Sequence, residues 1–113
     1  MAEPLRGEVW NVNLNPTRGR EQSGSRPALV VSHNRFNESV AELVIVVPIT
    51  STERGIPLHV RIVPPEGGLK NVSFAKCEDV RSVSKERLTK RLGTVSRPTL
   101  AAVEDRLRIV LDL

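Results

Sequence analysis

The loop Pro16–Pro27 holds the side chains of this chain that are best suited to chemistry. It reads Pro-Thr-Arg-Gly-Arg-Glu-Gln-Ser-Gly-Ser-Arg-Pro, and therefore brings three arginines, a carboxylate, an amide and small hydroxyls close together. A loop that only turns the chain needs Gly, Pro and an Asx residue. Guanidinium groups bind phosphate oxygens, and a carboxylate can accept a proton. The loop therefore contains the groups needed to grip a phosphodiester.

Arg26 and Glu21 are the candidate reactive groups of this loop. Because Pro27 disfavours helical geometry in the residue before it, we expect Arg26 in extended backbone at the start of a strand. A guanidinium fixed there could stabilise a transition-state phosphate, and Glu21 could take a proton from a ribose 2′-hydroxyl. Each residue also has an ordinary interpretation: Arg26 as an exposed arginine paired with a neighbour, and Glu21 as the partner of Arg20 or Arg26.

Thr50 is a third candidate, because it ends the most apolar segment and begins the run Thr-Ser-Thr. A hydroxyl that emerges from a buried strand can bind a phosphate oxygen, although such hydroxyls also cap turns. His33 and His59 do not form a pair beside a nucleophile, and the carboxylates are scattered. We therefore expect no cofactor, no two-metal site and a metal-independent reaction.

The composition predicts a single globular domain over residues 1–113, with 39% hydrophobic and 27% charged residues. A net charge of +4 and few aromatic residues favour a Val/Leu/Ile-rich sheet and an acidic partner such as nucleic acid. The single cysteine, Cys77, excludes an intramolecular disulfide. We see no signal peptide and no apolar run longer than Leu43–Ile49, so a cytoplasmic location without membrane contact is expected.

The elements that must position these groups are mostly strands. Alternating or continuous apolar residues predict strands at Gly7–Leu14, Pro27–Ser32, Glu42–Thr50, Pro57–Val63, Asn71–Cys77, Glu78–Val83 and Leu92–Val95. One helical turn is expected within His33–Ser39, and Pro48 should interrupt pairing just before Ile49. After Ser96, a credible N-cap, the apolar period changes to that of a helix. These signals predict a mostly antiparallel, partly barrel-like sheet with one C-terminal helix.

A basic segment precedes this helix. Residues 81–97 contain six basic residues against one acid, Glu86. Such a segment can follow a nucleic-acid backbone or an acidic protein segment, or it can simply be a solvated face.

Four motifs in order resemble the MazF/PemK (Kid) family of toxin endoribonucleases. They are Arg6-Gly-Glu-Val-Trp10, the Asn15-Pro16 and Gly19–Pro27 loop, Ala28–Ser32, and Val46-Val-Pro-Ile-Thr-Ser51, and the likeness extends to the terminal helix. The resemblance implies an SH3-like or CcdB–PemK small barrel of antiparallel strands, a homodimer, and cleavage of single-stranded RNA at short motifs. It also implies a cognate antitoxin whose acidic C-terminal segment covers the RNA site, and contact with operator DNA only through that antitoxin.

Carried over by position, the family's catalytic arginine falls on Arg26, its catalytic threonine on Thr50, and an assisting acid on Glu21. The RNA-contacting residues expected from the same loops and motifs are Arg18, Arg20, Gln22, Ser23, Ser25, Ser51, Arg54, Asp79 and Arg81. Many relatives have Glu-Gln-Ile-Arg where this chain has Glu78-Asp-Val-Arg81. Because an acid replaces an amide that can donate hydrogen bonds, we expect the difference to alter the recognised RNA motif.

The expected reaction is in-line attack of the 2′-hydroxyl on the adjacent phosphate, which gives a 2′,3′-cyclic phosphate and a 5′-hydroxyl. Two other functions remain open on the sequence. A CcdB-like gyrase-binding toxin shares the fold but depends on a tryptophan near the C-terminus, whereas the only tryptophan here is Trp10. A non-catalytic RNA-binding barrel needs only the basic charge.

Overall fold

Strands dominate the computed structural model, which describes residues 3–14 and 24–113. The strands are β1 (Glu8–Asn13), β2 (Ser25–Val30), β3 (Leu43–Thr50), β4 (His59–Ile62), β5 (Ser73–Lys76), β6 (Arg81–Ser84) and β7 (Leu88–Thr94). The helices are α1 (Asn34–Asn37) and α2 (Arg97–Leu111), with 3-10 turns η1 (Glu66–Gly68), η2 (Cys77–Asp79) and η3 (Lys85–Arg87). The strands pair in the order β4-β5-β3-β2-β1-β7, with β6 also on β3, and every pair is antiparallel. The predicted fold class is confirmed.

β3 is the strand on which the sheet is built. It pairs with β2 along one edge, and along the other it pairs first with β6, from Leu43 to Val46, and then with β5, at Ile49 and Thr50. Pro48, which has no N–H to donate, falls between these two partners. The prediction of an interruption at Pro48 is therefore confirmed for this edge, although the strand itself continues to Thr50.

Successive residues of β3 face opposite sides of the sheet and enter two different cores. Val47 and Ile49 join the helix-side core, in which Val103 of α2, Ile62 of β4 and Ala75 of β5 are also buried. Val44 and Val46 join the far-side core with neighbours from β1, β2, β6 and β7: Trp10, Val12, Leu14, Ala28, Val30, Val83 and Leu88. Burial on both faces explains why the segment reads as a continuous apolar run.

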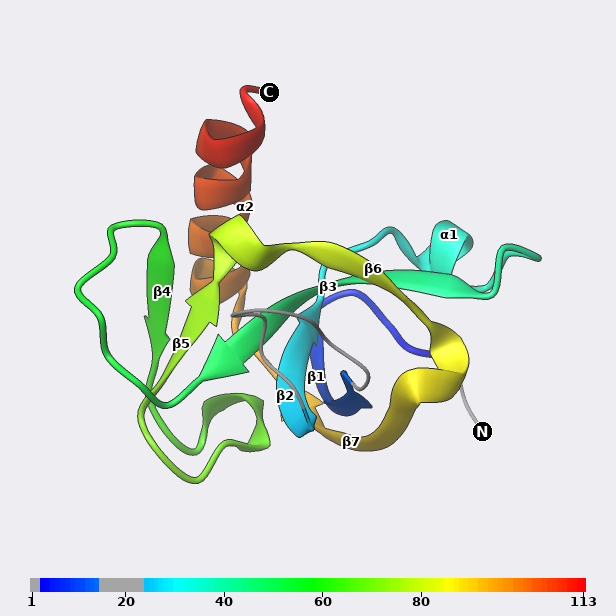
Figure 1. Ribbon diagram of the computed structural model, residues 1–113, viewed down its shortest axis with the longest axis horizontal. Helices are drawn as coiled ribbons and strands as arrows, with labels where there is room; N and C mark the ends of the chain where they lie inside the picture. The colour runs from blue at the N-terminus through cyan, green and yellow to red at the C-terminus, as the bar shows by residue number, and fades with distance from the viewer. Residues whose placement is uncertain (1–2, 15–23) are drawn as a thin grey trace.

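The C-terminal helix begins where the sequence predicts. Ser96 is the N-cap, and its hydroxyl accepts a hydrogen bond from the Thr99 N–H. Figure 1 shows α2 beside β4 and β5, with its last turns extending beyond the sheet toward the C-terminus. No helix among the described residues is long and apolar enough to cross a membrane.

Several strand limits differ from the sequence predictions. β2 begins at Ser25, because Ser25 and Arg26 pair with Asn13 and Val12 of β1. The 3-10 turn η2 separates β5 from β6. β7 begins at Leu88 rather than Leu92, and its pairing with β1 contains two register shifts. Such irregularities break the alternation of apolar residues that sequence periodicity depends on.

The turn η1 packs directly on β7, and only glycine allows the approach. Gly68 has φ +70°, and a Cβ on it would overlap the Leu92 carbonyl, while a Cβ on Gly93 would lie 2.6 Å from the Gly68 nitrogen. Glu66 in the same turn accepts hydrogen bonds from the Ser96 N–H and hydroxyl at 2.9 and 3.0 Å. The turn thereby ties β7 to the start of α2.

We predict that Gly68→Ala lowers the free energy of unfolding by about 2–4 kcal/mol, from overpacking together with left-handed strain. Gly55→Ala is the matched control, because Gly55 also has positive φ (+65°) but open space around it. The control should cost about 1–2 kcal/mol for its backbone conformation alone. Urea unfolding measures both values, and equal losses would contradict the steric explanation.

Glu8 joins the N-terminal segment to β1 and β7. Its carboxylate accepts hydrogen bonds from the Leu5 N–H at 2.8 Å, the Trp10 indole at 3.0 Å and Arg91 at 2.6 Å. Burial raises the pKa of this carboxyl, but the three donors and the positive charge of Arg91 outweigh it and bring the pKa below the ordinary 4.5. The network favours the ionised form of Glu8.

A lowered pKa makes part of the stability depend on pH. The contribution of Glu8 to the free energy of unfolding is fully present when the pH is above the ordinary pKa of 4.5. It is lost as the pH falls through the lower pKa of the folded state. We predict that Glu8→Gln is less stable than wild type at neutral pH, and that the difference shrinks in acid. Glu38→Gln, at an exposed position, is the control. Parallel stability curves for wild type and Glu8→Gln between pH 7 and 3 would contradict this role.

Candidate functional site

Arg26 and Thr50 line one open cleft of ≈ 370 Å³. The cleft lies where β2 begins and β3 ends, between these strands and the segment that follows η1. Its lining residues are Asn11, Arg26, Pro27, Ile49, Thr50, Ser51, Gly68, Leu69, Lys70, Asn71, Ser73, Lys90 and Leu92. The structure thus brings together two of the three residues that the sequence nominated for chemistry.

The register of β2 and β3 accounts for this convergence. Ala28 lies opposite Pro48, and the same register continued by two residues brings Arg26 opposite Thr50. Positions two apart in a strand share a face, and directly opposed side chains are neighbours. Arg26 is exposed and Thr50 is half-buried. A guanidinium and a hydroxyl therefore project into the same cleft from backbone that is held in the sheet.

The Thr50 hydroxyl already accepts one hydrogen bond. The Thr52 N–H donates to Thr50 Oγ1 at 3.2 Å, so the residue does cap the turn after β3. A hydroxyl has two lone pairs and one proton, and accepting this bond leaves the proton available for donation. Thr50 can therefore cap the turn and also bind a ligand. The hydrogen bond from Thr52 holds the hydroxyl oxygen in place, and its proton can be donated to the ligand.

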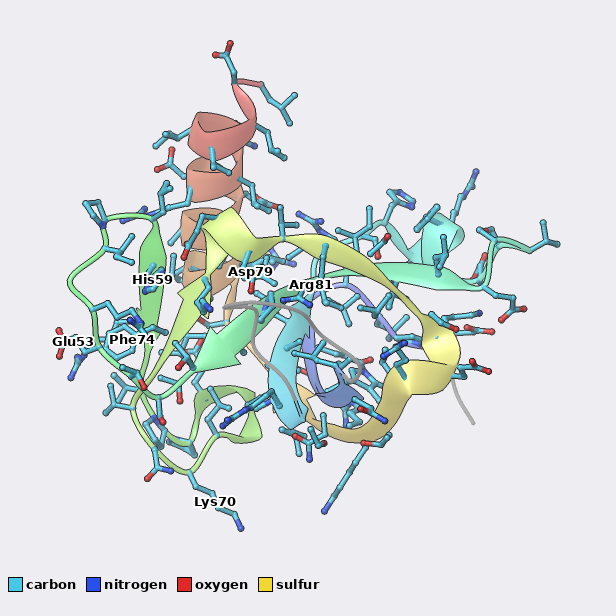
Figure 2. All side chains as sticks on the ribbon, viewed as in Figure 1. Glu53, His59, Lys70, Phe74, Asp79 and Arg81 are labelled. Carbon is cyan, nitrogen blue, oxygen red and sulfur yellow. The ribbon has the colours of Figure 1, made fainter. Side chains whose placement is uncertain are left out.

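Some cleft residues were not foreseen from the sequence. Asn11 lies opposite both Pro27 and Lys90, so the polar face of β1 and one residue of the basic segment join the cleft wall. Lys70 and Asn71 come from the loop before β5, and Figure 2 shows Lys70 extending outward from that loop. The sequence shows that Asn11 alternates with apolar neighbours. Only the pairing of β1 with β2 and β7 shows that Asn11 lines this cleft.

Of the other expected RNA-contacting residues, Ser51 lines the cleft, whereas Ser25 and Arg54 are exposed outside its lining. Asp79 accepts a 2.9 Å hydrogen bond from Arg81, and its carboxylate lies 3.7 Å from Lys76. Asp79 and Arg81 are also absent from the lining; Arg81 instead lines a separate cavity of ≈ 230 Å³ with Arg87, Ser82 and Ser84. Of these five residues, Ser51 lines the cleft, Arg81 lines the separate cavity, and Ser25, Arg54 and Asp79 line neither.

The remaining nominated residues, Glu21, Arg18, Arg20, Gln22 and Ser23, lie outside the described residues. The described ends of their segment are joined, because the Leu14 N–H donates to the Gly24 carbonyl at 3.0 Å. Gly24 is two residues from Arg26, and Glu21 is three residues from Gly24.

The cleft is electropositive. Arg26, Lys70 and Lys90 line it, and the described lining residues include no carboxylate. Guanidinium, ammonium, hydroxyl and amide groups in one open cleft match the oxygens of a phosphodiester. Among the described residues, no group of three or more His, Cys, Asp or Glu side chains could hold a metal ion. The arrangement can bind and polarise an extended polyanion.

Comparisons with known proteins point to one family. Residues 5–111 match the family described as PemK-like, MazF-like toxin of type II toxin-antitoxin system. The chain is 39% identical to the endoribonuclease MazF9 of Mycobacterium tuberculosis, over 96% of each protein. The fold resembles the crystal structure of MazF from Deinococcus radiodurans, with a TM-score of 0.87, 30% identity and full coverage of both chains. It also resembles a MazE-MazF structure from that organism, with a TM-score of 0.82 and 31% identity over 100% of this chain and 99% of that one.

Proposed function

This chain belongs to the family of PemK-like, MazF-like toxins of type II toxin–antitoxin systems, and from that premise we propose that it is a sequence-specific endoribonuclease acting on single-stranded RNA. The observation that carries the proposal is the presence of Arg26 and Thr50 in one electropositive cleft. The two similar proteins reported above are named MazF9 and MazF, after the same family. MazF9 is also named an endoribonuclease.

In the proposed reaction the RNA supplies its own nucleophile. The 2′-oxygen attacks the adjacent phosphorus while the bond to the 5′-oxygen breaks, which yields a 2′,3′-cyclic phosphate and a 5′-hydroxyl. Negative charge grows on the phosphate oxygens as the transition state forms. The Arg26 guanidinium and the Thr50 hydroxyl bind those oxygens and stabilise that charge in a site organised before the substrate arrives.

Two proton transfers complete the reaction. Glu21 is the proposed base that removes the 2′-hydroxyl proton, because it is a carboxylate only five residues before Arg26 in the sequence. A guanidinium does not release its proton near neutrality, so Arg26 is not the acid. Water gives a proton to the leaving 5′-oxygen. No step needs a metal ion, because the nucleophile is already held beside the phosphorus.

Two protein partners follow from the same proposal. The MazE-MazF structure supports a cognate antitoxin, whose acidic segment would compete with RNA for the cleft and would alone contact operator DNA. A homodimer is supported by apolar side chains exposed at the end of α2, namely Ile109, Val110, Leu111 and Leu113. Cleavage of messenger RNA would take place in the cytoplasm.

We predict that Arg26→Ala and Thr50→Val each lower the rate of RNA cleavage in EDTA by about a hundredfold, because each removes one preorganised donor. Arg35→Ala, an exposed arginine on α1, should leave the rate unchanged. The measurement is single-turnover cleavage of a long mixed RNA, with mapping of the new ends. RNA binding without cleavage by wild type would favour a non-catalytic binding barrel, and gyrase inhibition would favour a CcdB-like toxin.

We predict that Lys70→Ala weakens RNA binding with little effect on the single-turnover rate at saturating enzyme. If Lys70 contacts one phosphate, the slope of log K against log salt should fall by about 0.7 for a single strand. Lys85→Ala is the control, because Lys85 lies outside the cleft lining and its ammonium is 2.6 Å from the Glu3 carboxylate. Equal salt slopes for wild type and Lys70→Ala would show that Lys70 does not contact an RNA phosphate.

A further inference from the structure

β6 is an edge strand with one open side. Among the described residues it pairs with β3 alone, from Arg81 opposite Val46 to Ser84 opposite Leu43. Figure 1 shows β6 running along β3 between the turns η2 and η3. The open side of an edge strand presents N–H and C=O groups with which a further strand can pair. The backbone of β6 can therefore receive another chain on that side.

The pairing pattern identifies which backbone groups face the open side. The Lys85 N–H donates to the Glu42 carbonyl at 3.0 Å, one position beyond the pair of Leu43 with Ser84. Hydrogen-bonded pairs alternate with non-bonded pairs in an antiparallel ladder, so Ser84 belongs to a non-bonded pair. The same holds for Ser82, two residues earlier. Both serines therefore direct their backbone N–H and C=O groups away from β3.

The opposite strand gives an independent check of this assignment. Ile45 of β3 lies opposite Ser82. Its N–H donates to Ser32 Oγ at 3.0 Å, and its carbonyl accepts from the Val31 N–H at 3.0 Å. Both backbone groups of Ile45 thus point away from β6, as a non-bonded pair requires.

A cavity of ≈ 230 Å³, here called the β6 cavity, opens at this edge. Ser82 is exposed and Ser84 is half-buried, so both can be reached by a partner. The described lining contains two guanidinium groups and no carboxylate. Its residues are Leu14, Leu43, Arg81, Ser82, Val83, Ser84 and Arg87. The edge therefore combines backbone hydrogen-bonding groups with positive charge.

The two guanidinium groups lie near the two ends of β6, and each is positioned by a hydrogen bond. Arg81, the first residue of β6, donates to the Asp79 carboxylate at 2.9 Å. Arg87, in η3 after the strand, donates to the Asn13 carbonyl at 3.2 Å. A guanidinium has five N–H donors in a rigid fork, so it binds several acceptors at once. Fixed guanidinium groups beside both ends of the strand favour a partner that carries carboxylates.

The backbone groups favour a peptide over a nucleic acid. Ser82 and Ser84 each present a donor and an acceptor, and an extended peptide presents the same alternation in return. The phosphates of RNA only accept hydrogen bonds, so they would leave the outward carbonyls of β6 without donors. The charge and the backbone pattern together indicate an acidic, extended peptide.

We propose that the open edge of β6 binds an acidic peptide segment, which adds as a strand through the backbone of Ser82 and Ser84 and directs carboxylates at Arg81 and Arg87. This surface is additional to the cleft, where the proposed function places RNA and an acidic antitoxin segment, and it does not depend on RNA cleavage. No described residue lines both cavities.

The β6 cavity is also distant from the cleft along β3. Leu43 lines the β6 cavity and Thr50 lines the cleft, at the two ends of this strand. A rise of about 3.3 Å per residue separates them by about 23 Å. We therefore expect the peptide and RNA to bind at the same time.

The test measures binding of a short fluorescein-labelled peptide, in which Glu alternates with Val, by fluorescence anisotropy with the full chain. Ser84 has φ −63°, which already fits proline, and its N–H does not pair with β3. Ser84→Pro removes that N–H and the hydroxyl, whereas the matched control Ser84→Ala removes only the hydroxyl. Ser84→Pro should lower the affinity by about fivefold to tenfold, the cost of one hydrogen bond, and Ser84→Ala by less than about twofold.

Two peptide analogues test the same contact without changing the protein. One carries N-methyl groups on the odd amides and the other on the even amides, so their charge is equal. Only one of these sets can face β6, and the analogue methylated there should bind wild type at least about fivefold more weakly than the other. Arg87→Gln should weaken binding and reduce its salt dependence, whereas Arg35→Gln, an exposed control on α1, should change neither.

Equal affinities for Ser84→Pro and Ser84→Ala, together with equal affinities for the two analogues, would exclude strand addition. Displacement of the peptide by a 2′-O-methyl RNA, with loss of binding in Arg26→Ala, would place the peptide in the cleft and overturn the second surface. A smaller sedimentation coefficient for Ser84→Pro than for Ser84→Ala would assign the edge to a second copy of the chain instead. Weaker RNA binding by Ser84→Pro, without peptide binding, would assign it to RNA.

The outcomes for the two proposals are separate. If wild type cleaves RNA and does not bind the peptide, only the β6 proposal fails. If wild type binds the peptide with the expected dependence on Ser84 and cleaves no RNA, only the proposed endoribonuclease function fails.

Discussion

The pairing of β3 with three different strands is the constraint on which the rest of the structure depends. Its β2 edge fixes the register that brings Arg26 opposite Thr50, and its other edge passes from β6 to β5 around Pro48. The change of partner brings β5 and β4 alongside the end of β3, and with them Phe74 and Arg61. Thr50, the last residue of β3, therefore lines the cleft and also pairs with Phe74 of β5.

The distribution of carboxylates explains how a modest net charge of +4 yields a cationic cleft. Several acids outside the cleft are held in ion pairs: Glu8 with Arg91, Asp79 with Arg81, Glu104 with Arg6, and Glu3 with Lys85. The described lining of the cleft, by contrast, has basic residues and no acid. These four carboxylates thus neutralise basic side chains that lie outside the cleft lining. Among the described lining residues, an approaching polyanion meets the basic side chains of Arg26, Lys70 and Lys90.

How far sequence reasoning reaches depends on the range of the interaction that decides each feature. The Ser96 cap and the buried β3 segment are local patterns, and both were predictable. Arg26 and Thr50 could be nominated from residue type and family resemblance, but their shared cleft required the β2–β3 register. The positions of Lys70 and Asn11 in the cleft depend on contacts between segments far apart in the sequence. The start of β7 was missed because bulges in its pairing with β1 hide its alternation.

Phosphate binding and base recognition place different demands on this fold. Phosphate binding in the cleft uses groups that contact every nucleotide alike, whereas a base can be distinguished only by a fixed donor or acceptor. The departure from the Glu-Gln-Ile-Arg pattern at Asp79 lies in η2, and no residue of η2 lines the cleft. A substitution in η2 therefore changes donors and acceptors outside the cleft while Arg26 and Thr50 remain in place.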